Sequence, residues 1–513
     1  MKSRRPYTLQ ISHTNSAWKD SLLDFLQKCT REKDLASARI CYDLLVRNCL
    51  ERLSFWGDYL IRLFATCATL PDSNRVFEKV FSPTIYTWNA IISAHVNADD
   101  LHGAVRLQRC MELNCVEPDR VTFLCMLKVC KGLLDPLQGK ILHIRICEHG
   151  LATDHIIGNA LVDMFAKVGL MEDAHKVFDN LIIHDRISWS ALIAGYAHHG
   201  YPHIALDLYT NMYRSGIEHD RAILLSVAKA ISCTQCLILG RLLHMMSVED
   251  GLDFDVMLGS ALIDMYAKCN GMDDAKSIFD KLQKRNVVSW GALIAGYSSQ
   301  GYDSIVCDLY EQMQQQGIQA DRVIFLCVLK ACGALGALQH GYIIDDLLRR
   351  RSIDIDKILG SALIELYVLC GRLDDAGRIL MNIDMPNNIV WGTLMSGYAI
   401  NGNREMIEKC IAAMQQEGLD LNNMVVTQVL ASTSHSGSFE VGYHYFNSLI
   451  TNQASISSIE HYTCMIDLLA RAGCLDAAAN LQNTMPLPPD DIIQRSLLTG
   501  CKIHSINTAT FSI

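Results

Sequence analysis

The stretch GNALVDMFAKVGLMEDAHKVFD at residues 158–179 returns twice without a gap, as GSALIDMYAKCNGMDDAKSIFD at residues 259–280 and as GSALIELYVLCGRLDDAGRIL at residues 360–380. Each copy begins 101 residues after the copy before it. The same offset relates ISWSALIAGY from Ile187 to VSWGALIAGY from Val288. A superperiod this regular is the signature of a repeat architecture, in which each unit packs only against its neighbours.

Aspartate or asparagine ends the smaller units inside this superperiod. These residues divide the chain into units of 35, 31 and 35 residues, which together make 101. The register predicts fourteen units over residues 19–490, beginning at residues 19, 54, 85, 120, 155, 186, 221, 256, 287, 322, 357, 388, 423 and 459. Residues 491–513 start like a further unit, and we expect a C-terminal extension that is cut short there.

Each unit has the pattern of two amphipathic helices. In the unit from residue 287, Trp290, Leu293 and Tyr297 follow helical spacing, and Gly301 comes next as a helix breaker. One such hairpin cannot bury its own apolar stripe, so neighbouring hairpins must stack. The sequence therefore predicts an all-α fold, a superhelical solenoid of stacked helix-turn-helix repeats of tetratricopeptide-like type.

The composition is that of a folded chain without a broad basic surface. Of 513 residues, 50% are hydrophobic and 19% are charged, and the formal net charge is −10. Wholesale disorder is excluded, and any binding of nucleic acid must be local rather than a general attraction to phosphate. The apolar stretches are interrupted before the ~18 residues of a membrane helix, so we expect no membrane span. Residues 1–18 are basic and hydroxyl-rich without an acid, which predicts an organelle transit segment.

No cluster of residues predicts a metal centre or catalysis. Cys233 and Cys236 form one C-x-x-C without a second pair, which is a weak zinc or redox signal. His198, His199 and His203 surround a turn, and we interpret them as solvated turn residues. We expect no metal, no cofactor and no small-molecule substrate.

The units of 35, 31 and 35 residues resemble pentatricopeptide repeats of the mixed plant class, whose motifs are called P, L and S. The resemblance rests on the order of lengths and on the motifs SW(S/G)ALIAGY, LVDMFAKxG and FLxxLKxC, and it covers residues 19–490. It implies a protein that binds single-stranded RNA in the mitochondrion or, as an alternative, in the chloroplast. Many members of this class end in a zinc deaminase-like domain, which needs a His-x-Glu. The sequence contains no His-x-Glu, so we expect no enzyme activity.

In that family, the fifth residue of a P or S unit reads one base together with the last residue of the unit. The resemblance transfers this role to Asn89 with Asp119, Asn159 with Asp185, Ser190 with Asp220, Ser260 with Asn286, Gly291 with Asp321, Ser361 with Asn387, Gly392 with Asn422, and Thr463 with Asp490. The two glycines offer no side chain to a base, so we expect weak discrimination there. Asp58 with Thr84 departs from the pattern. The implied target, read 5′ to 3′ from the unit at residue 85, is U-n-U-G-n-A-n-n-A-n-n-G.

Two other register positions carry information about RNA binding. Family members use an apolar second residue to contact base faces, and here these residues are Tyr86, Ile156, Ile187, Met257, Val288, Ile358 and Ile389. The fifth residue of the L units is leucine at Leu23, Leu124, Leu225 and Leu326. Leucine neither donates nor accepts a hydrogen bond, so these units are not expected to read base edges.

Both kinds of contact have a purely structural interpretation. The last Asp or Asn of a unit could simply cap the next helix, because such side chains accept the unpaired N–H groups of a first turn. The coupled change at the fifth position, polar or Gly in P and S units but Leu in L units, favours base reading. The apolar second residues are as well explained by packing between helices as by base contact.

Several functions stay open from the sequence. The first is recognition of sites for C-to-U RNA editing, with a deaminase or other editing-complex proteins supplied in trans. The second is stabilisation, splicing or translation of an organelle transcript. The third is a protein-binding helical-repeat scaffold, which the acidic charge favours and the fifth-position alternation opposes. A degenerate product without function is the fourth.

Overall fold

Helices account for the secondary structure of the described chain. The computed structural model describes residues 16–47, 53–67, 69–252, 255–351, 355–383, 386–419, 423–436, 439–452, 459–485 and 491–503. Over these ranges it contains 29 α-helices and no strand, which confirms the prediction of an all-α, hairpin-repeat fold. None of the described helices is both long enough and apolar enough to span a bilayer. The chain divides into two parts, residues 1–252 and 253–513.

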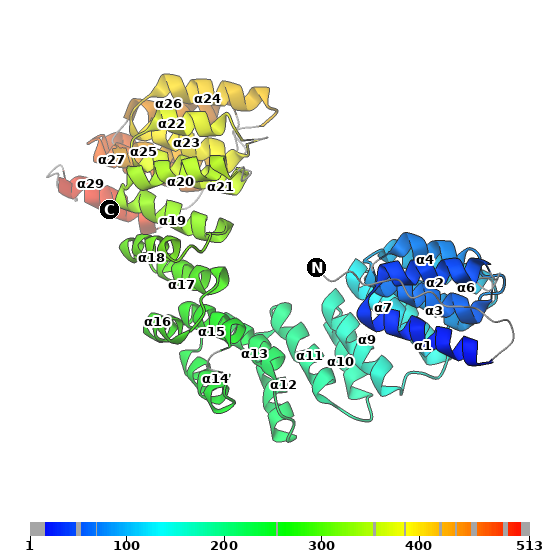
Figure 1. Ribbon diagram of the computed structural model, residues 1–513. Coiled ribbons are helices and arrows are strands. Elements are labelled where there is room, and N and C mark those ends of the chain that lie inside the picture. Colours follow the sequence, from blue (N-terminus) through cyan, green and yellow to red (C-terminus); the bar gives the residue numbers. More distant parts are fainter. Residues whose placement is uncertain are drawn as a thin grey trace. The chain divides into compact units, whose positions relative to one another are not determined.

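The first part contains helices α1 to α14, which follow one another as antiparallel pairs (Figure 1). From α3 onward, every odd-numbered helix begins at the first residue of a unit defined by the sequence register, whereas α1 begins three residues before residue 19. The helices are α1 (Ser16–Glu32), α2 (Leu35–Arg47), α3 (Ser54–Thr66), α4 (Leu70–Phe77), α5 (Ile85–Asn97), α6 (Leu101–Leu113), α7 (Arg120–Leu133), α8 (Pro136–Glu148), α9 (His155–Val168), α10 (Met171–Asp179), α11 (Arg186–His198), α12 (Pro202–Arg214), α13 (Arg221–Thr234) and α14 (Leu237–Glu249).

The second part repeats the same arrangement from residue 256. Its last helix, α29, lies within the segment that the sequence assigned to a shortened extension. The helices are α15 (Val256–Lys268), α16 (Met272–Lys281), α17 (Val287–Ser299), α18 (Asp303–Gln315), α19 (Arg322–Leu335), α20 (Leu338–Arg350), α21 (Lys357–Leu369), α22 (Leu373–Leu380), α23 (Asn388–Ile400), α24 (Arg404–Gln416), α25 (Asn423–Ser436), α26 (Phe439–Asn452), α27 (Ile459–Arg471), α28 (Leu475–Thr484) and α29 (Asp491–Ile503).

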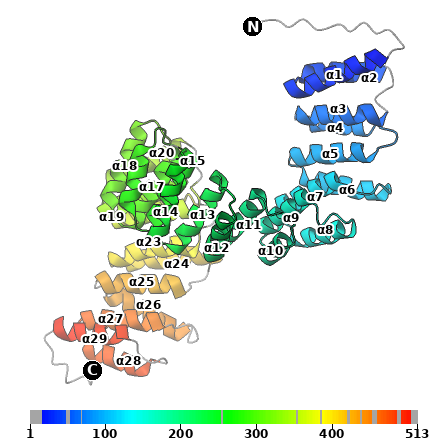
Figure 2. The same ribbon diagram turned by 90° about the horizontal axis from the view of Figure 1, so that it is seen from below.

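Stacking of the first helices holds each part together. Within the first part, α3, α5, α7, α9, α11 and α13 each contact the next in the series, and within the second part the odd-numbered helices from α15 to α29 do the same. Figure 2 shows α1/α2, α3/α4 and α5/α6 as successive layers. Second helices such as α10 lie against the first helix of their own hairpin and that of the following one. The first helices therefore form a continuous row in each part.

One aromatic contact recurs at the 101-residue spacing and closes one unit against the next. A phenylalanine at the end of a second helix lies edge-to-face against a tryptophan in the first helix that follows, a geometry that favours aromatic pairs. The ring centroids are 4.8 Å apart for Phe77 and Trp88, 4.7 Å for Phe178 and Trp189, and 4.6 Å for Phe279 and Trp290. The 101-residue repeat of the sequence is therefore also a repeat of the contacts in the core.

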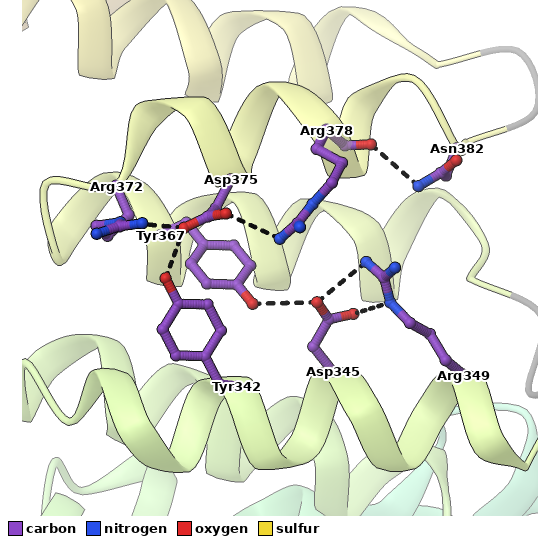
Figure 3. Close-up of polar contacts among 8 residues, drawn as sticks. All are labelled: Tyr342, Asp345, Arg349, Tyr367, Arg372, Asp375, Arg378 and Asn382. Carbon is purple, nitrogen blue, oxygen red and sulfur yellow. Dashed lines mark hydrogen bonds and ion pairs between the residues drawn. The ribbon is translucent and has the colours of Figure 1, made fainter.

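The buried carboxylate of Asp345 pairs with an arginine of its own helix, α20, and with a tyrosine of α21 (Figure 3). Asp345 is 5% exposed, and its carboxylate accepts hydrogen bonds from Arg349 Nε at 2.9 Å and Arg349 Nη2 at 3.1 Å. Tyr367, which is fully buried on α21, donates its hydroxyl hydrogen to the same carboxylate at 3.1 Å. These contacts satisfy a buried carboxylate, which would otherwise be costly to keep away from water.

A second polar contact ties α20 to α22 beside this ion pair (Figure 3). Tyr342 on α20 donates its hydroxyl hydrogen to Asp375 at 2.6 Å, and Arg372 and Arg378 donate to the same carboxylate at 3.0 and 2.8 Å. The Tyr342 hydrogen bond, together with the two arginines and against the effect of burial, lowers the pKa of Asp375. This corner of the second part is therefore fixed by charge-assisted hydrogen bonds.

Candidate nucleic-acid interface

The last residue of each described P or S unit from Asp119 to Asn387 caps the first helix of the next unit. One side-chain oxygen accepts the backbone N–H three residues on: Asp119 from Thr122 at 2.9 Å, Asp185 from Ser188 at 2.8 Å, Asp220 from Ile223 at 3.0 Å, Asn286 from Ser289 at 2.9 Å, Asp321 from Ile324 at 3.0 Å, and Asn387 from Val390 at 3.1 Å. Asn422 and Asp490 lie outside the described residues. Capping is thus one role of these side chains, and it leaves the second oxygen of each aspartate or the amide nitrogen of each asparagine outside the cap.

Asn89 and Asp119 are in direct contact in the first part. Asn89 lies on α5 and is 4% exposed, and its amide nitrogen donates to Asp119 Oδ1 at 2.9 Å. The hydroxyl of Thr122 donates to Asn89 Oδ1 at 2.6 Å. The carboxylate that caps α7 is therefore bound to the fifth residue of the preceding P or S unit.

Asn159 and Asp185 make the same contact in the unit of residues 155–185. Asn159 Nδ2 donates to Asp185 Oδ2 at 2.9 Å, and His155 Nε2 lies 3.1 Å from the same oxygen. Burial alone would raise the pKa of Asp185, but hydrogen bonds from the Ser188 N–H, Asn159 and His155 lower it overall. Asn159 Oδ1 is buried without a hydrogen-bond partner, an acceptor that typically costs about 1–3 kcal/mol.

Hydroxyl pairs of which both residues are described do not make this contact. Ser260 donates its hydroxyl hydrogen to the Val256 carbonyl at 2.7 Å, and Thr463 donates to the Ile459 carbonyl at 2.8 Å. Ser190 with Asp220 and Ser361 with Asn387 share the register, but no hydrogen bond joins either pair in the described structure. A short hydroxyl side chain on a helix bonds readily to the carbonyl one turn back, so it stays close to its own helix.

The two glycines at the fifth position differ in the space around them. A Cβ at Gly291 would meet the nearest atoms, on Ile324, at 3.6 and 3.7 Å, which is ordinary contact. A Cβ at Gly392 would lie 2.5 Å from Gln428 Oε1. Gln428, on α25, therefore occupies the space that a side chain at residue 392 would need.

The apolar second residues all lie at the surface. Their exposed fractions run from 45% at Ile156 to 64% at Ile187, and the full set is Tyr86, Ile156, Ile187, Met257, Val288, Ile358 and Ile389. Packing between helices therefore does not account for their apolar character. Contact with base faces stays a proposal for these residues.

Three more residues at the second position were missed by the sequence reasoning. Phe55, Val121 and Val323 are the second residues of the units that begin at residues 54, 120 and 322, and each is exposed. The signal was present in the sequence, because all three occupy the same register position, Phe55 in a 31-residue unit and the two valines in L units. The leucines at the fifth position of the L units, in contrast, are half-buried at Leu23, Leu124, Leu225 and Leu326.

The polar groups of this face do not assemble into a metal site. Over the described ranges, no three His, Cys, Asp or Glu side chains lie where they could share an ion. The candidate interface consists of two recessed pairs, Asn89 with Asp119 and Asn159 with Asp185, and of exposed apolar side chains at the second position of the units.

Family models match the chain over several of these hairpins. A model described as the PPR repeat family matches residues 83–131, and one described as PPR repeat matches residues 159–184, 187–217, 260–287, 288–318, 389–419 and 460–486. The stacked helical hairpins define a helical-repeat protein in which each repeat is a pair of antiparallel helices.

Relatives in Arabidopsis thaliana complete the identification. The chain is 29% identical over 95% of its length to the putative pentatricopeptide repeat-containing protein At3g15130, and covers 71% of that protein. It is 30% identical over 81% of its length to the putative protein At3g11460, mitochondrial, and 26% identical over 94% to DOT4, chloroplastic, covering 67% of each. The chain belongs to the pentatricopeptide repeat family. It spans about half, 54%, of another relative, At4g33990.

A solved structure has the same fold. The crystal structure of maize PPR10 in complex with an 18-nt psaJ RNA element matches with a TM-score of 0.57 and 15% identity, over 92% of this chain and 70% of that one. At this identity the likeness concerns the fold.

Proposed function

We propose that the chain binds single-stranded RNA in a plant organelle and marks a site for C-to-U editing, with the deaminase or other editing-complex proteins supplied in trans. The observation that carries the proposal is the repeated 2.9 Å hydrogen bond of Asn89 to Asp119 and of Asn159 to Asp185. Each pair presents amide and carboxylate groups that can discriminate between base edges. The protein acts by binding and not by catalysis.

The exposed second residues supply the other half of base binding. Ile156 and Ile187 are the second residues of successive units, and both are exposed. Apolar side chains at this spacing suit the flat faces of a base, while the recessed Asn159 and Asp185 suit its polar edge. In this account the L units, with leucine at the fifth position, belong to a P, L and S organisation and act as spacers in base reading.

The relatives support the organelle in this proposal. Their names assign At3g11460 to the mitochondrion and DOT4 to the chloroplast, and the PPR10 structure contains RNA. We place this chain in the mitochondrion, with the chloroplast as the alternative.

An electrophoretic shift assay tests the RNA-binding step. The probe is single-stranded RNA with the string U-n-U-G-n-A-n-n-A-n-n-G, compared with RNAs changed at one assigned base at a time. Selective loss of binding supports base reading. Equal binding to all probes, or none, contradicts it and favours a protein-binding scaffold.

Sequencing of organelle transcripts tests the editing step. In plants that lack the protein, we expect loss of C-to-U conversion at a cytidine a few nucleotides 3′ of a matching site. Intact editing with altered transcript ends or abundance would favour the second function, in which the array protects or processes a transcript.

A further inference from the structure

A glutamine of the following unit takes the place of the missing side chain at Gly392. Gly392 is the fifth residue of the unit that begins at residue 388, and Gln428 lies on α25, the first helix of the next unit. A Cβ at Gly392 would lie 2.5 Å from Gln428 Oε1, a separation that real side chains do not reach. The amide group of Gln428 therefore lies where the other P and S units carry the side chain of their own fifth residue.

Two serines hold α23 against α25 one helical turn beyond this contact. Ser396 Oγ lies 2.6 Å from Ser432 Oγ, and Ser432 donates its hydroxyl hydrogen to the carbonyl oxygen of Gln428 at 2.8 Å. Because that hydrogen is already used, Ser396 is the donor between the two serines. The two serines follow Gly392 and Gln428 by four residues each, which is about one turn of a helix. A polar contact thus fixes the register that places Gln428 beside Gly392.

The amide of Gln428 is available to a ligand. Its side chain is half-buried, so it is recessed but still reached by solvent. Among the residues that the structure describes, neither its Oε1 nor its Nε2 has a hydrogen-bond partner. The amides of Asn89 and Asn159, in contrast, donate to an aspartate. Gln428 therefore offers an acceptor and two N–H donors to an incoming base.

The unit that contains Gln428 differs from the L units at two register positions. Its fifth residue is Thr427, where the L units have leucine. Its sixth residue is Gln428, where the L units have the shorter side chains of Asp24, Cys125, Ser226 and Cys327. Both differences put hydrogen-bonding groups next to the unit of Gly392.

Gly291 provides an internal comparison, because it precedes Gly392 by 101 residues. The described atoms that a Cβ at Gly291 would meet within 4 Å belong to Ile324, and Cys327, which precedes Gln428 by 101 residues, is not among them. An amide therefore replaces the fifth side chain at Gly392 and not at Gly291.

We propose, resting on the RNA-binding function above, that Gln428 reads the base assigned to the unit of Gly392, and that it selects adenine. This base is the tenth of the RNA string, which becomes U-n-U-G-n-A-n-n-A-A-n-G. Oε1 accepts a hydrogen bond from the exocyclic amine of adenine, and Nε2 donates to the adjacent ring nitrogen. A glutamine amide suits adenine because each carries a donor beside an acceptor. Adenine presents this pattern on its Watson–Crick edge and on its Hoogsteen edge, and both are open in a single strand.

Four RNAs of 12 nucleotides that differ only at the tenth base test the proposal. Each keeps the assigned bases at all other positions, and fluorescence anisotropy measures its Kd for the full chain. The wild type should bind the RNA with adenine about fivefold or more tightly than each of the other three, because a two-bond contact to a base discriminates by at least this factor.

Two substitutions separate base reading from packing. Gln428→Met keeps an unbranched side chain of similar length but has no amide, and Gln428→Ala removes the side chain beyond Cβ. Both should abolish the preference at the tenth base and leave the preference for U at the third base unchanged. Gln415→Ala, at an exposed glutamine of α24, is the matched control and should keep the wild-type preference. Thermal unfolding of every variant checks that the fold is retained.

Different failures have different meanings. If the wild type discriminates at the third base but binds all four RNAs equally, or if Gln428→Met keeps the preference for adenine, Gln428 does not read a base and the RNA-binding function stands. A wild-type preference for another base at the tenth position overturns the selection of adenine. If the wild type discriminates at no assigned base, the proposed function is wrong and the proposal for Gln428 falls with it.

Discussion

The amide nitrogen of Asn159 lies 2.9 Å from Oδ2 of Asp185, while Oδ1 of the same carboxylate holds the backbone N–H of Ser188. One side chain therefore serves two units, because it closes the first turn of α11 and binds the fifth residue of the unit before. The cap at this position is therefore compatible with the proposed base reading, and substitutions can separate the two roles.

Asp185→Asn should keep the cap and alter the base preference. Asparagine caps helices about as well as aspartate, so thermal stability should change little. Preference for U at the third base of the proposed RNA should fall, as measured by competition with RNAs altered at that base. Asp185→Ala should lose the preference and also about 1 kcal/mol of stability, because the Ser188 N–H loses its acceptor. Unchanged base preference in both variants would exclude Asp185 from reading.

Acid should destabilise the protein partly through the same carboxylate. The folded-state pKa of Asp185 is lowered, so its contribution to stability is present above the unfolded pKa, near about 3.9, and is lost as pH falls through the folded value. Between pH 5 and pH 3 the melting temperature of the wild type should therefore fall more than that of Asp185→Asn. Asp207→Asn, at an exposed aspartate on α12, should follow the wild type.

Truncation of an exposed second residue should weaken RNA binding without unfolding the chain. Ile187 is 64% exposed, so Ile187→Ala should change stability by less than about 0.5 kcal/mol. Loss of its contact with a base face should lower RNA affinity by roughly 1 kcal/mol, or about fivefold. Ile182→Ala, at an exposed isoleucine between α10 and α11, is the control for apolar truncation. Equal affinities for the two variants would argue against the base-face role.

A serine at residue 291 should create a base preference where none is expected. The space above Gly291 accepts a Cβ at ordinary contact distance from Ile324, and Ser is the better helix former. With Asp321 as its partner, Gly291→Ser should gain preference for G at the seventh base. Gly291→Ala adds the same carbon without the hydroxyl and should gain none. Gly392→Ser should need displacement of Gln428 and give a smaller effect.

The ion pair of α20 should be a stabilising element of the second part. Tyr367→Phe removes the hydroxyl donor to Asp345 and should cost about 1–2 kcal/mol, because a hydrogen bond to a buried carboxylate is lost. Tyr302→Phe, at an exposed tyrosine, should be nearly neutral. Chemical denaturation of both variants measures the difference, and equal midpoints would show that Arg349 alone satisfies Asp345.

The period of the sequence was enough to predict the helical hairpins, because the spacing of residues such as Trp290 and Leu293 and the breaker Gly301 act locally. The pairing of Asn159 with Asp185 came instead from the resemblance to pentatricopeptide repeats, which assigns a shared role to the fifth and last residues of a unit. The sequence did not predict which partner a side chain would bind. Ser260, for example, donates its hydroxyl hydrogen to the Val256 carbonyl of its own helix and not to Asn286.

Contacts between separate helices were also beyond sequence reasoning. His198 was interpreted as a solvated turn residue, and its contact with Lys229 depends on how α11 stacks on α13. The space around Gly392 depends likewise on a glutamine from the following unit. Such features depend on side-chain length and helix packing, which a repeat length does not specify.

The same edge-to-face contact joins Phe77 to Trp88 and, 101 residues later, Phe178 to Trp189. Blocks of 101 residues therefore begin with equivalent packing contacts and can replace one another. Excision of residues 85–185 would join Thr84 to Arg186 and present Trp189 to Phe77 in the place that Trp88 now fills. Thr84 already precedes a first helix as its N-terminal residue, so the junction would recreate an existing one. Chains of this kind can therefore lengthen or shorten by whole blocks, and under the proposed function the length of the RNA site would follow the number of blocks that a gene retains.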